Sequence, residues 1–325
     1  MLINAGETKN VGVELTVNTV NFSTKKFSWN TTLTLSHNKN SVKALTGEAV
    51  QLYEARFGFN QNTHRIAVGE PLGQFYGYIT EGLYQVDDFN YDASTQTYTL
   101  KDGIPYHGDK GRIRPGMWKF KNLAGDDNVI DENDKTVIGN AQPKFYGGLN
   151  NSFTYKGFDL SIFLTFSYGN EVLNATKLVT SKVGSLNYNA LDVMNSSNRW
   201  MTINSDGQKV TDPGELAALN AGKTVAAYHD AQQGDNYIHS WAVEDASYLK
   251  LSNVTLGYTF PKNLIARVGL KNLRLYATGN NLLTWTKYSG FDPEVSTMKS
   301  GLTPGVDFGA YPLSRSFIFG LNVAF

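Results

Sequence analysis

The segment from Arg315 to the C-terminal Phe325 constrains the fold more than any other part of the chain. As a strand, it would carry five apolar side chains on one face: Phe317, Phe319, Leu321, Val323 and Phe325. The other face would carry Ser316, Ile318, Gly320, Asn322 and Ala324. In water, an apolar edge strand at a terminus invites aggregation. In a membrane β-barrel the same strand forms part of the wall and its apolar face meets lipid, so the segment favours a barrel.

The overall composition is compatible with a barrel and excludes several other classes. The mean hydropathy of −0.32 is typical of soluble proteins, but it is a weak guide for barrels, whose strands alternate and whose loops are polar. The sequence contains no run of about eighteen apolar residues, which argues against a transmembrane helix. The 325 residues include no cysteine and have a net charge of zero. The composition therefore excludes a disulfide scaffold and a cysteine nucleophile, and it indicates no nucleic-acid partner.

Alternating apolar and polar residues predict three antiparallel hairpins before the terminal strand: 11–21 with 27–36, 145–155 with 158–168, and 248–260 with 273–285. The connections are short, and the second is only Lys156-Gly157. In 248–260 the alternation changes phase near Asn253, which predicts a β-bulge at that position.

Long polar stretches separate the hairpins, at residues 37–65, 86–143, 169–247 and 286–314. Such loops are uncommon inside a compact domain but typical of the outer side of a bacterial barrel, whose periplasmic turns are short. If the turns near 24, 156 and 266 are periplasmic, strand direction places Phe325 in the periplasm and starts the chain on the outer side. The number of wall strands between Ser36 and Phe145 must then be zero or two, with 74–84 paired with 117–121 or 95–100 as candidates. We therefore expect seven to nine wall strands.

Two features leave alternatives open. Alternating strands are also typical of a secreted β-sandwich or jelly roll. In addition, residues 1–4 lack the basic and apolar regions of a signal peptide, although a barrel protein must cross the inner membrane. If the barrel interpretation is right, the chain is expected to be a fragment of a longer protein, because an odd strand count cannot make a complete bacterial barrel.

Several sequence blocks, in this order and spacing, resemble the SusC/RagA-type TonB-linked outer-membrane proteins of Bacteroidetes. The blocks are GEPLGQFYGY at 69–78, VIGNAQPKFYGG at 137–148, VEDASYLKL at 243–251, LGYTFP at 256–261, GNNLLTW at 279–285, YSGFDPE at 288–294 and YPLSR at 311–315. The chain end also resembles the C-terminal signal of outer-membrane barrels, through Gly320, Val323 and Phe325. The resemblance runs along nearly the whole chain.

This resemblance implies an all-β fold, namely the C-terminal part of a barrel of 22 strands that an N-terminal domain plugs. It implies a place in the cell outer membrane and import of a glycan or a peptide, with a SusD-like surface lipoprotein as lid. TonB-ExbB-ExbD would act through the N-terminal region, for which we find no counterpart in these residues. The barrel insertion machinery would read the terminal signal. Residues 1–325 alone are not expected to import anything.

An acidic segment, NLAGDDNVIDEND at 122–134, resembles a family segment that is similar to calcium loops. Alternating carboxylate and amide oxygens are the hard ligands that Ca²⁺ prefers. The candidate ligands are Asp126, Asn128, Asp131 and Asp134. The segment departs from the pattern at Asn122, at Ala124 and in its spacing, so a turn-rich solvated loop is the competing interpretation.

The sequence carries no motif for catalysis. The five histidines, His37, His64, His107, His229 and His239, lack metal-binding spacing, and all lie in predicted loops. No nucleophile elbow, P-loop or Rossmann fingerprint occurs. The acidic pair Glu244-Asp245 is compatible with glycosidase acids, but the family resemblance places it at the start of a strand. We therefore predict that the chain is not an enzyme, and a loop-housed hydrolase remains a hypothesis without a motif.

Two groups of aromatic residues have functional interpretations. Those near strand ends are predicted to form interfacial girdles: Trp29, Tyr155, Tyr168, Tyr258, Trp285 and Phe325. Those in loops are candidates for contacting a ligand or the lid: Tyr53, Phe57, Phe59, Tyr106, Trp118, Tyr188, Trp200, Tyr228, Tyr237 and Trp241. Of these we single out Trp118, Trp200, Tyr237 and Trp241, with packing of loop on loop as the competing interpretation. The same aromatics would serve a secreted carbohydrate-binding or adhesin module, the alternative function.

Overall fold

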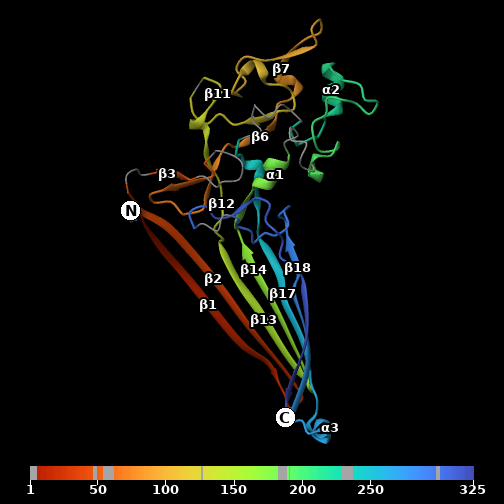
Figure 1. Cartoon of the computed structure of the whole chain (residues 1–325). Coiled ribbons are helices and arrows are strands. Elements are labelled where there is room, and N and C mark those ends of the chain that lie inside the picture. Colours follow the sequence, from red (N-terminus) through yellow and green to blue (C-terminus); the bar gives the residue numbers. More distant parts are fainter. Residues whose placement is uncertain are drawn as a thin grey trace.

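The computed structural model of the chain describes residues 6–46, 50–53, 62–125, 127–181, 189, 191–227, 237–297 and 301–325. It consists of one long sheet with a folded layer of loops at one end (Figure 1). The long sheet contains β1 (Gly6–Ser23), β2 (Phe27–Leu45), β13 (Phe145–Tyr155), β14 (Phe158–Tyr168), β17 (Tyr248–Thr259), β18 (Asn272–Thr286) and β20 (Ser316–Ala324). No helix in the described part of the chain is long and apolar enough to span a membrane.

The outer layer is built from short strands and helices in the segments that connect the long strands. Its strands are β3 (Val50–Tyr53), β4 (His64–Ala67), β5 (Gln74–Gly77), β6 (Thr80–Leu83), β7 (Phe89–Asp92), β8 (Thr97–Leu100), β9 (Tyr106–His107), β10 (Trp118–Phe120), β11 (Val129–Ile130), β12 (Thr136–Asn140), β15 (Glu171–Asn174), β16 (Val243–Asp245) and β19 (Val306–Asp307). Its α-helices are α1 (Ala175–Thr180) and α2 (Pro213–Leu219), and its 3₁₀ turns are η1 (Val86–Asp88), η2 (Lys110–Arg112), η3 (Glu132–Asp134), η4 (Asp192–Met194) and η5 (Ser240–Ala242). At the other end of the sheet lie α3 (Lys262–Ile265) and η6 (Ala266–Val268).

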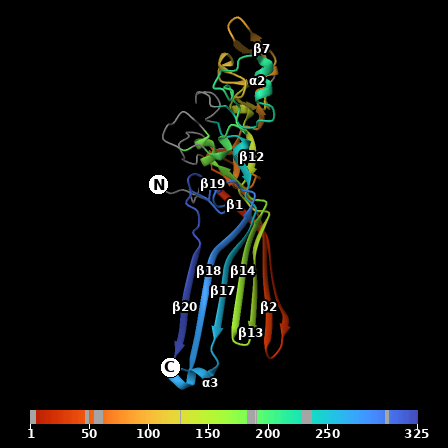
Figure 2. The same cartoon turned by 90° about the vertical axis from the view of Figure 1, so that its right-hand side faces the viewer.

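The long sheet is an antiparallel meander in the order β1-β2-β13-β14-β17-β18-β20. All three predicted hairpins are confirmed. In the tightest, Lys156 and Gly157 both have positive φ, at 47° and 91°, as a type I′ turn requires. The three turns and the C-terminus share one end of the sheet, whereas the chain starts at the end that carries the outer layer (Figures 1 and 2). The strand directions expected from the sequence are therefore found.

Within the described residues the wall contains seven strands, because β2 pairs directly with β13 despite the long segment between them. The predicted wall candidates within 74–84, 95–100 and 117–121 correspond to β5, β6, β8 and β10, which lie in small sheets of the outer layer. That assignment was wrong for a physical reason: these strands are short, and their apolar residues are buried in the loop core instead of facing lipid. In addition, β2 continues to Leu45, beyond the predicted end at Ser36.

The strand register gathers the apolar side chains on one face of the sheet. One row of directly opposed residues crosses all seven strands: Phe22, Trp29, Phe153, Leu160, Leu256, Ala277 and Phe319. A second row crosses six strands: Val17, Leu33, Leu149, Leu164, Leu251 and Leu283. In the described part of the chain no second long sheet packs on this face, which rules out the sandwich architecture for these strands. The face is therefore free to meet lipid.

The opposite face is polar and is hydrogen-bonded from strand to strand. Asn253 Nδ2 donates to Asn280 Oδ1 at 2.7 Å, and Thr255 and Thr278 share a hydroxyl bond of 2.8 Å. Near the turns, Arg274 donates two bonds to Asp159 across β17. This crossing needs Gly257, because a Cβ there would lie 2.4 Å from Arg274 Nη2. A polar, water-facing surface is typical of a barrel interior.

The predicted bulge near Asn253 is present. Leu164 pairs with Leu251 and Phe163 with Asn253, so Ser252 is the extra residue of β17. On β18, Asn281 takes a left-handed conformation with φ of 52° beside the same irregularity. The bulge changes the phase of the strand, and as a result Leu249 and Leu251 stay on the same face as Val254 and Leu256.

Aromatic rings border the apolar face at both ends. At the turn end, Phe158 and Tyr258 have ring centroids 4.5 Å apart; at the outer end, Phe145 and Tyr168 are 4.8 Å apart. The two bands lie about ten residues apart on β14, roughly 33 Å along the strand. A strand tilt of about 45° reduces this to roughly 23 Å, close to the ~25 Å apolar band of outer-membrane barrels.

Candidate functional site

The outer layer has a packed aromatic cluster at its centre. Phe120 of β10 stacks on Tyr78 with centroids 5.3 Å apart, and Trp118 contacts Trp241 at 5.0 Å. Trp200 is only 1% exposed and Trp118 only 6%. Tyr237 and Trp241 are half-buried against the same cluster. The structure therefore brings together the four aromatics singled out from the sequence, but as packing partners, and it presents neither Trp118 nor Trp200 to solvent.

The other loop aromatics proposed from the sequence divide into two groups. Tyr106 is half-buried against a neighbouring core cluster with Tyr84 and Phe89. Phe57, Phe59, Tyr188 and Tyr228 lie outside the described residues, and the side chain of Tyr53 is likewise not described.

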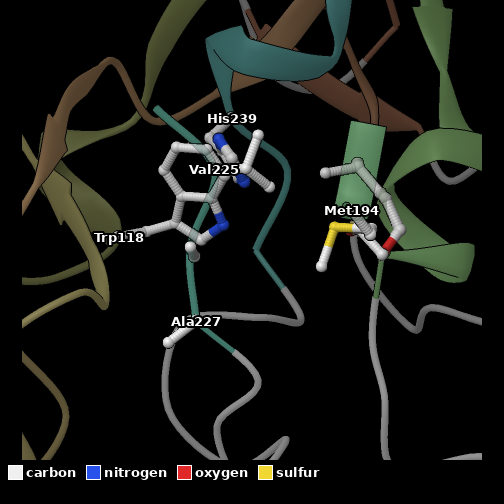
Figure 3. A pocket seen from close by; sticks show the side chains of 8 residues that line it. Trp118, Met194, Val225, Ala227 and His239 are labelled. Atoms are coloured by element: carbon white, nitrogen blue, oxygen red, sulfur yellow. The ribbon is translucent and has the colours of Figure 1, made fainter. Parts of the chain in front are cut away.

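A small hollow beside the aromatic cluster is too narrow for a ligand. Trp118, Val225 and His239 face Met194 across it (Figure 3), and its volume is about 10 Å³, room for a single water. Burial, reinforced by the charge of Lys177 and by His107, lowers the pKa of His239 to about 3. His239 is therefore neutral at physiological pH, and its Nδ1 has no hydrogen-bond partner among the residues that the structure describes.

We expect Trp200→Ala to loosen the outer layer without unfolding the wall. The ring of Trp200 fills the space over Gly116, where a Cβ would lie 2.3 Å from Trp200 Cγ. Removing a buried tryptophan costs about 3–5 kcal/mol. Limited proteolysis of the full-length protein in outer membranes should cut the outer layer at least tenfold faster, with the heat-modifiable gel shift of the barrel retained. Tyr311→Ala, at a 90% exposed aromatic, is the control and should leave the cleavage rate unchanged. An unchanged rate for Trp200→Ala would contradict the packing role.

The acidic segment forms a hydrogen-bonded turn. Asp134 is fully buried, and its two carboxylate oxygens accept bonds from the backbone N–H groups of Leu123, Ala124 and Asp131. Asp131 caps η3 by accepting from Asn133 N–H at 2.7 Å. Asn128 has a left-handed φ of 57°, and Asp126 lies outside the described residues. Among the described residues, no group of three or more His, Asp or Glu is placed to hold a metal. Calcium binding by the four predicted ligands stays a prediction.

A larger pocket opens on the same layer, between α1, η4 and the segments 289–291 and 307–310. Its volume is about 470 Å³. Asn174 and Asp307 lie at its buried floor, where β15 and β19 pair in parallel. Phe291, which is 83% exposed, lies at its rim. This pocket is large enough for part of a small molecule or one residue of an oligomer.

A buried ion pair fixes one wall of this pocket. Lys177 Nζ lies 3.0 Å from Glu244 Oε1 and 4.0 Å from the ring centroid of Trp241. Glu244 also accepts bonds from the backbone N–H and hydroxyl of Ser289, both at 2.9 Å. Burial raises the pKa of Glu244, but the bonds from Ser289 and the charge of Lys177 outweigh it, so the pKa is lowered overall. The carboxylate therefore stays ionised and ties α1, β16 and the 289 segment together.

A second buried contact fixes the floor of the pocket. Tyr288 donates its hydroxyl to Asp307 Oδ2 at 2.5 Å. Burial, followed by this bond, raises the pKa of Tyr288 well above its usual value. Thr176 Oγ1 donates to the carbonyl of Asp307 and accepts from Gly309 N–H. One wall and the floor of the pocket are therefore preorganised.

The sequence does not reveal this pocket as a site, although several of its residues lie in blocks that carry the family resemblance. Glu244 belongs to VEDASYLKL, and Tyr288, Ser289 and Phe291 belong to YSGFDPE. Of the acidic pair Glu244-Asp245, the first binds Lys177, and the second accepts hydrogen bonds from Ser247. No sequence pattern shows that the two blocks meet, because their contact depends on the pairing of β15 with β16 and β19.

His64 joins the start of the outer layer to its last loop. Its Nε2 bonds to the carbonyl of Pro304 at 2.9 Å and its Nδ1 to the hydroxyl of Thr63 at 2.8 Å. The imidazole is fully buried. Burial lowers its pKa to about 4, and the bond to Pro304 only partly offsets this.

We expect the outer layer to lose stability as the pH falls from 6.5 toward 4. An unfolded layer would protonate His64 near pH 6.5, whereas the folded layer resists protonation until about pH 4. The contribution of His64 to the stability of the outer layer is therefore fully present above pH 6.5. It is lost as the pH falls from 6.5 toward 4, and the loss is on the order of 3 kcal/mol. Proteolysis rates of the outer layer across this range should rise more steeply with acid in the wild type than in His64→Gln. Parallel pH profiles for the two proteins would contradict the assignment.

The terminal strand has the geometry expected of a wall strand. Gly320 lies opposite Tyr276, and a Cβ on Gly320 would lie 2.3 Å from Tyr276 Cζ. Glycine is required here because the Tyr276 ring covers it on the polar face. Val323 and Phe325 lie on the other face, and Phe325 is 80% exposed. Recognition of Gly320, Val323 and Phe325 by the barrel insertion machinery stays a prediction.

Comparison with known proteins covers the whole chain. TonB-dependent receptor P3 of Formosa agariphila is 33% identical over 99% of the chain, and TonB-dependent receptor SusC of Bacteroides thetaiotaomicron is 27% identical over all of it. The chain spans only 29% and 27% of their lengths. The RagAB peptide importer in its closed-closed state superposes with a TM-score of 0.67 at 20% identity, over 99% of the chain and 30% of the solved one. No family model matches the chain.

A meander with one apolar face, aromatic borders and a folded layer at one end defines the wall of an outer-membrane β-barrel. The match to about 30% of longer relatives fits a C-terminal portion of such a barrel. The chain belongs to the SusC/RagA-type TonB-dependent receptors and is an outer-membrane protein.

Proposed function

We propose that the full-length receptor imports an oligomeric nutrient, a glycan or a peptide, across the outer membrane. The observation that supports this most is the combination in one chain of a lipid-facing wall with a folded outer layer, over the whole length that aligns with TonB-dependent receptors. A SusD-like surface lipoprotein would cover the outer layer, and TonB-ExbB-ExbD would supply energy through the plug. The chain itself supplies wall and recognition surface, and we assign it no catalytic role.

Uptake by intact cells tests this function. Cells that produce the full-length receptor should accumulate fluorescent oligosaccharides or oligopeptides, and deletion of either the receptor gene or tonB should abolish accumulation of the same pool. Deleting the gene for the proposed SusD-like surface lipoprotein should reduce uptake. Equal accumulation of both pools with and without the receptor would overturn the proposal. Recovery of the receptor as a soluble extracellular protein would instead support the adhesin alternative.

A further inference from the structure

The 470 Å³ pocket of the outer layer differs from the small hollow beside Trp118 in being open and wide enough for a ligand. Its carbon surface comes from residues on three segments: Leu191, Val193, Phe291 and Ala310. Phe291 stands at the rim with 83% of its surface exposed and available to a ligand. This lining favours an apolar group.

Three of the six polar side chains that line the pocket are already paired within the protein, and a fourth, Asp192, is exposed to solvent. The Thr176 hydroxyl bonds to the backbone of 307 and 309, Ser289 Oγ bonds to Glu244, and Lys177 Nζ bonds to Glu244 and the carbonyl of Trp241. A sugar carries a hydroxyl on almost every ring carbon, and most of these would find no partner here. Burying unpaired hydroxyl groups is unfavourable. The pocket is therefore poorly suited to a pyranose ring.

One donor and one acceptor at the floor retain bonding capacity. Among the described residues, Asn174 Nδ2 makes only long contacts of 3.4 Å, to Glu244 and to Ser289. Within the same part of the chain, Asp307 Oδ1 accepts only from Ala310 N–H, at 3.3 Å. Asn174 and Asp307 are paired across β15 and β19, so the donor and the acceptor lie on neighbouring strands. A peptide unit offers the complementary carbonyl and N–H groups.

We propose that this pocket binds one residue of a peptide, with an apolar side chain between Phe291 and Val193 and the adjoining peptide group on Asn174 and Asp307. The proposal rests on the import function proposed above and narrows its substrate class at this site. The two buried contacts, Lys177 with Glu244 and Tyr288 with Asp307, hold one wall and the floor in place without a ligand, which reduces the entropic cost of binding.

Equilibrium binding to the full-length receptor, purified in detergent, tests the proposal. The probes are a pool of synthetic leucine-containing tetrapeptides, a matched pool with serine in place of leucine, and maltooligosaccharides. We expect the leucine pool to bind at least tenfold more tightly than the serine pool. Phe291→Ala should weaken leucine-pool binding about tenfold, and Val193→Asp should weaken it further. Tyr311→Ala, an exposed aromatic that does not line the pocket, should bind like the wild type.

Each other outcome overturns the proposal. If maltooligosaccharides bind and Phe291→Ala weakens their binding, the pocket is a sugar site. If the leucine pool binds and neither variant changes its affinity, peptide recognition lies elsewhere in the receptor. If none of the three probes binds, the pocket is not a binding site for them. Receptor-dependent uptake by cells, measured on the same variants, separates this failure from failure of the import function. The side chains of Phe291 and Val193 form no hydrogen bonds that hold the walls. If the variants keep heat-modifiable folding, a loss of peptide binding is therefore caused by the change in the pocket and not by misfolding.

Discussion

Replacing Leu164 with arginine in the full-length receptor is expected to reduce the amount of folded protein in the outer membrane several-fold. Leu164 lies in the middle of β14, between Leu149 and Leu251 in an unbroken apolar row. A charged side chain on the lipid face at this depth costs about 2–4 kcal/mol. No acidic residue pairs with position 164 in the register, so the charge would be uncompensated. The measurement is the heat-modifiable band in isolated outer membranes, compared with total receptor.

Ser161→Arg on the same strand is the matched control. Ser161 lies on the polar face, where its hydroxyl donates to Asn150 Oδ1 at 3.1 Å, and an arginine there remains in the hydrated interior. We expect folded levels near those of the wild type. If Leu164→Arg accumulates as well as Ser161→Arg, the apolar rows do not face lipid.

Replacing Phe325 with aspartate is expected to have an effect of similar size, through assembly. Phe325 ends the chain directly after β20 and is 80% exposed on the apolar face. A carboxylate there adds a second charge beside the chain terminus and removes the aromatic group of the predicted assembly signal. Unfolded receptor should accumulate in the periplasm and be degraded. Pulse-labelling followed by extraction of outer membranes measures the loss.

Phe325→Tyr preserves an aromatic terminus and should restore assembly to near the wild-type level. This control separates loss of the aromatic group from general sensitivity of the last residue. Equal surface levels for the aspartate and tyrosine proteins would show that Phe325 carries no assembly signal.

The strands of the wall were predictable from the sequence because the same strong constraint applies to each of them. A strand with lipid on one face and water on the other must alternate along its whole length, and β13 and β14 do so over 11 residues each. Even the bulge at Ser252 was visible as a change of phase. By contrast, β5, β6, β8 and β10 have three or four residues each and bury apolar groups in a local core. Short runs of this kind do not reveal which sheet they join.

The candidate site was only partly predictable. The aromatic residues of the outer layer were recognised, but an aromatic that contacts a ligand and one that packs in a core look alike in sequence, and Trp200 at 1% exposure belongs to the core. The pocket depends on residues that are distant in the chain, such as Lys177, Glu244 and Ser289. Their contacts follow from the pairing of short strands, which no local pattern specifies.

The orientation of β14 in the membrane tests the central claim most directly. The chain contains no cysteine, so single cysteines at Leu160, Ser161, Ile162, Phe163 and Leu164 of the full-length receptor report each position separately. In outer-membrane vesicles, a membrane-soluble maleimide should label the cysteines at 160, 162 and 164, and a charged, water-soluble maleimide should label those at 161 and 163. Equal labelling of all five by the charged reagent, or the opposite alternation, would contradict the account.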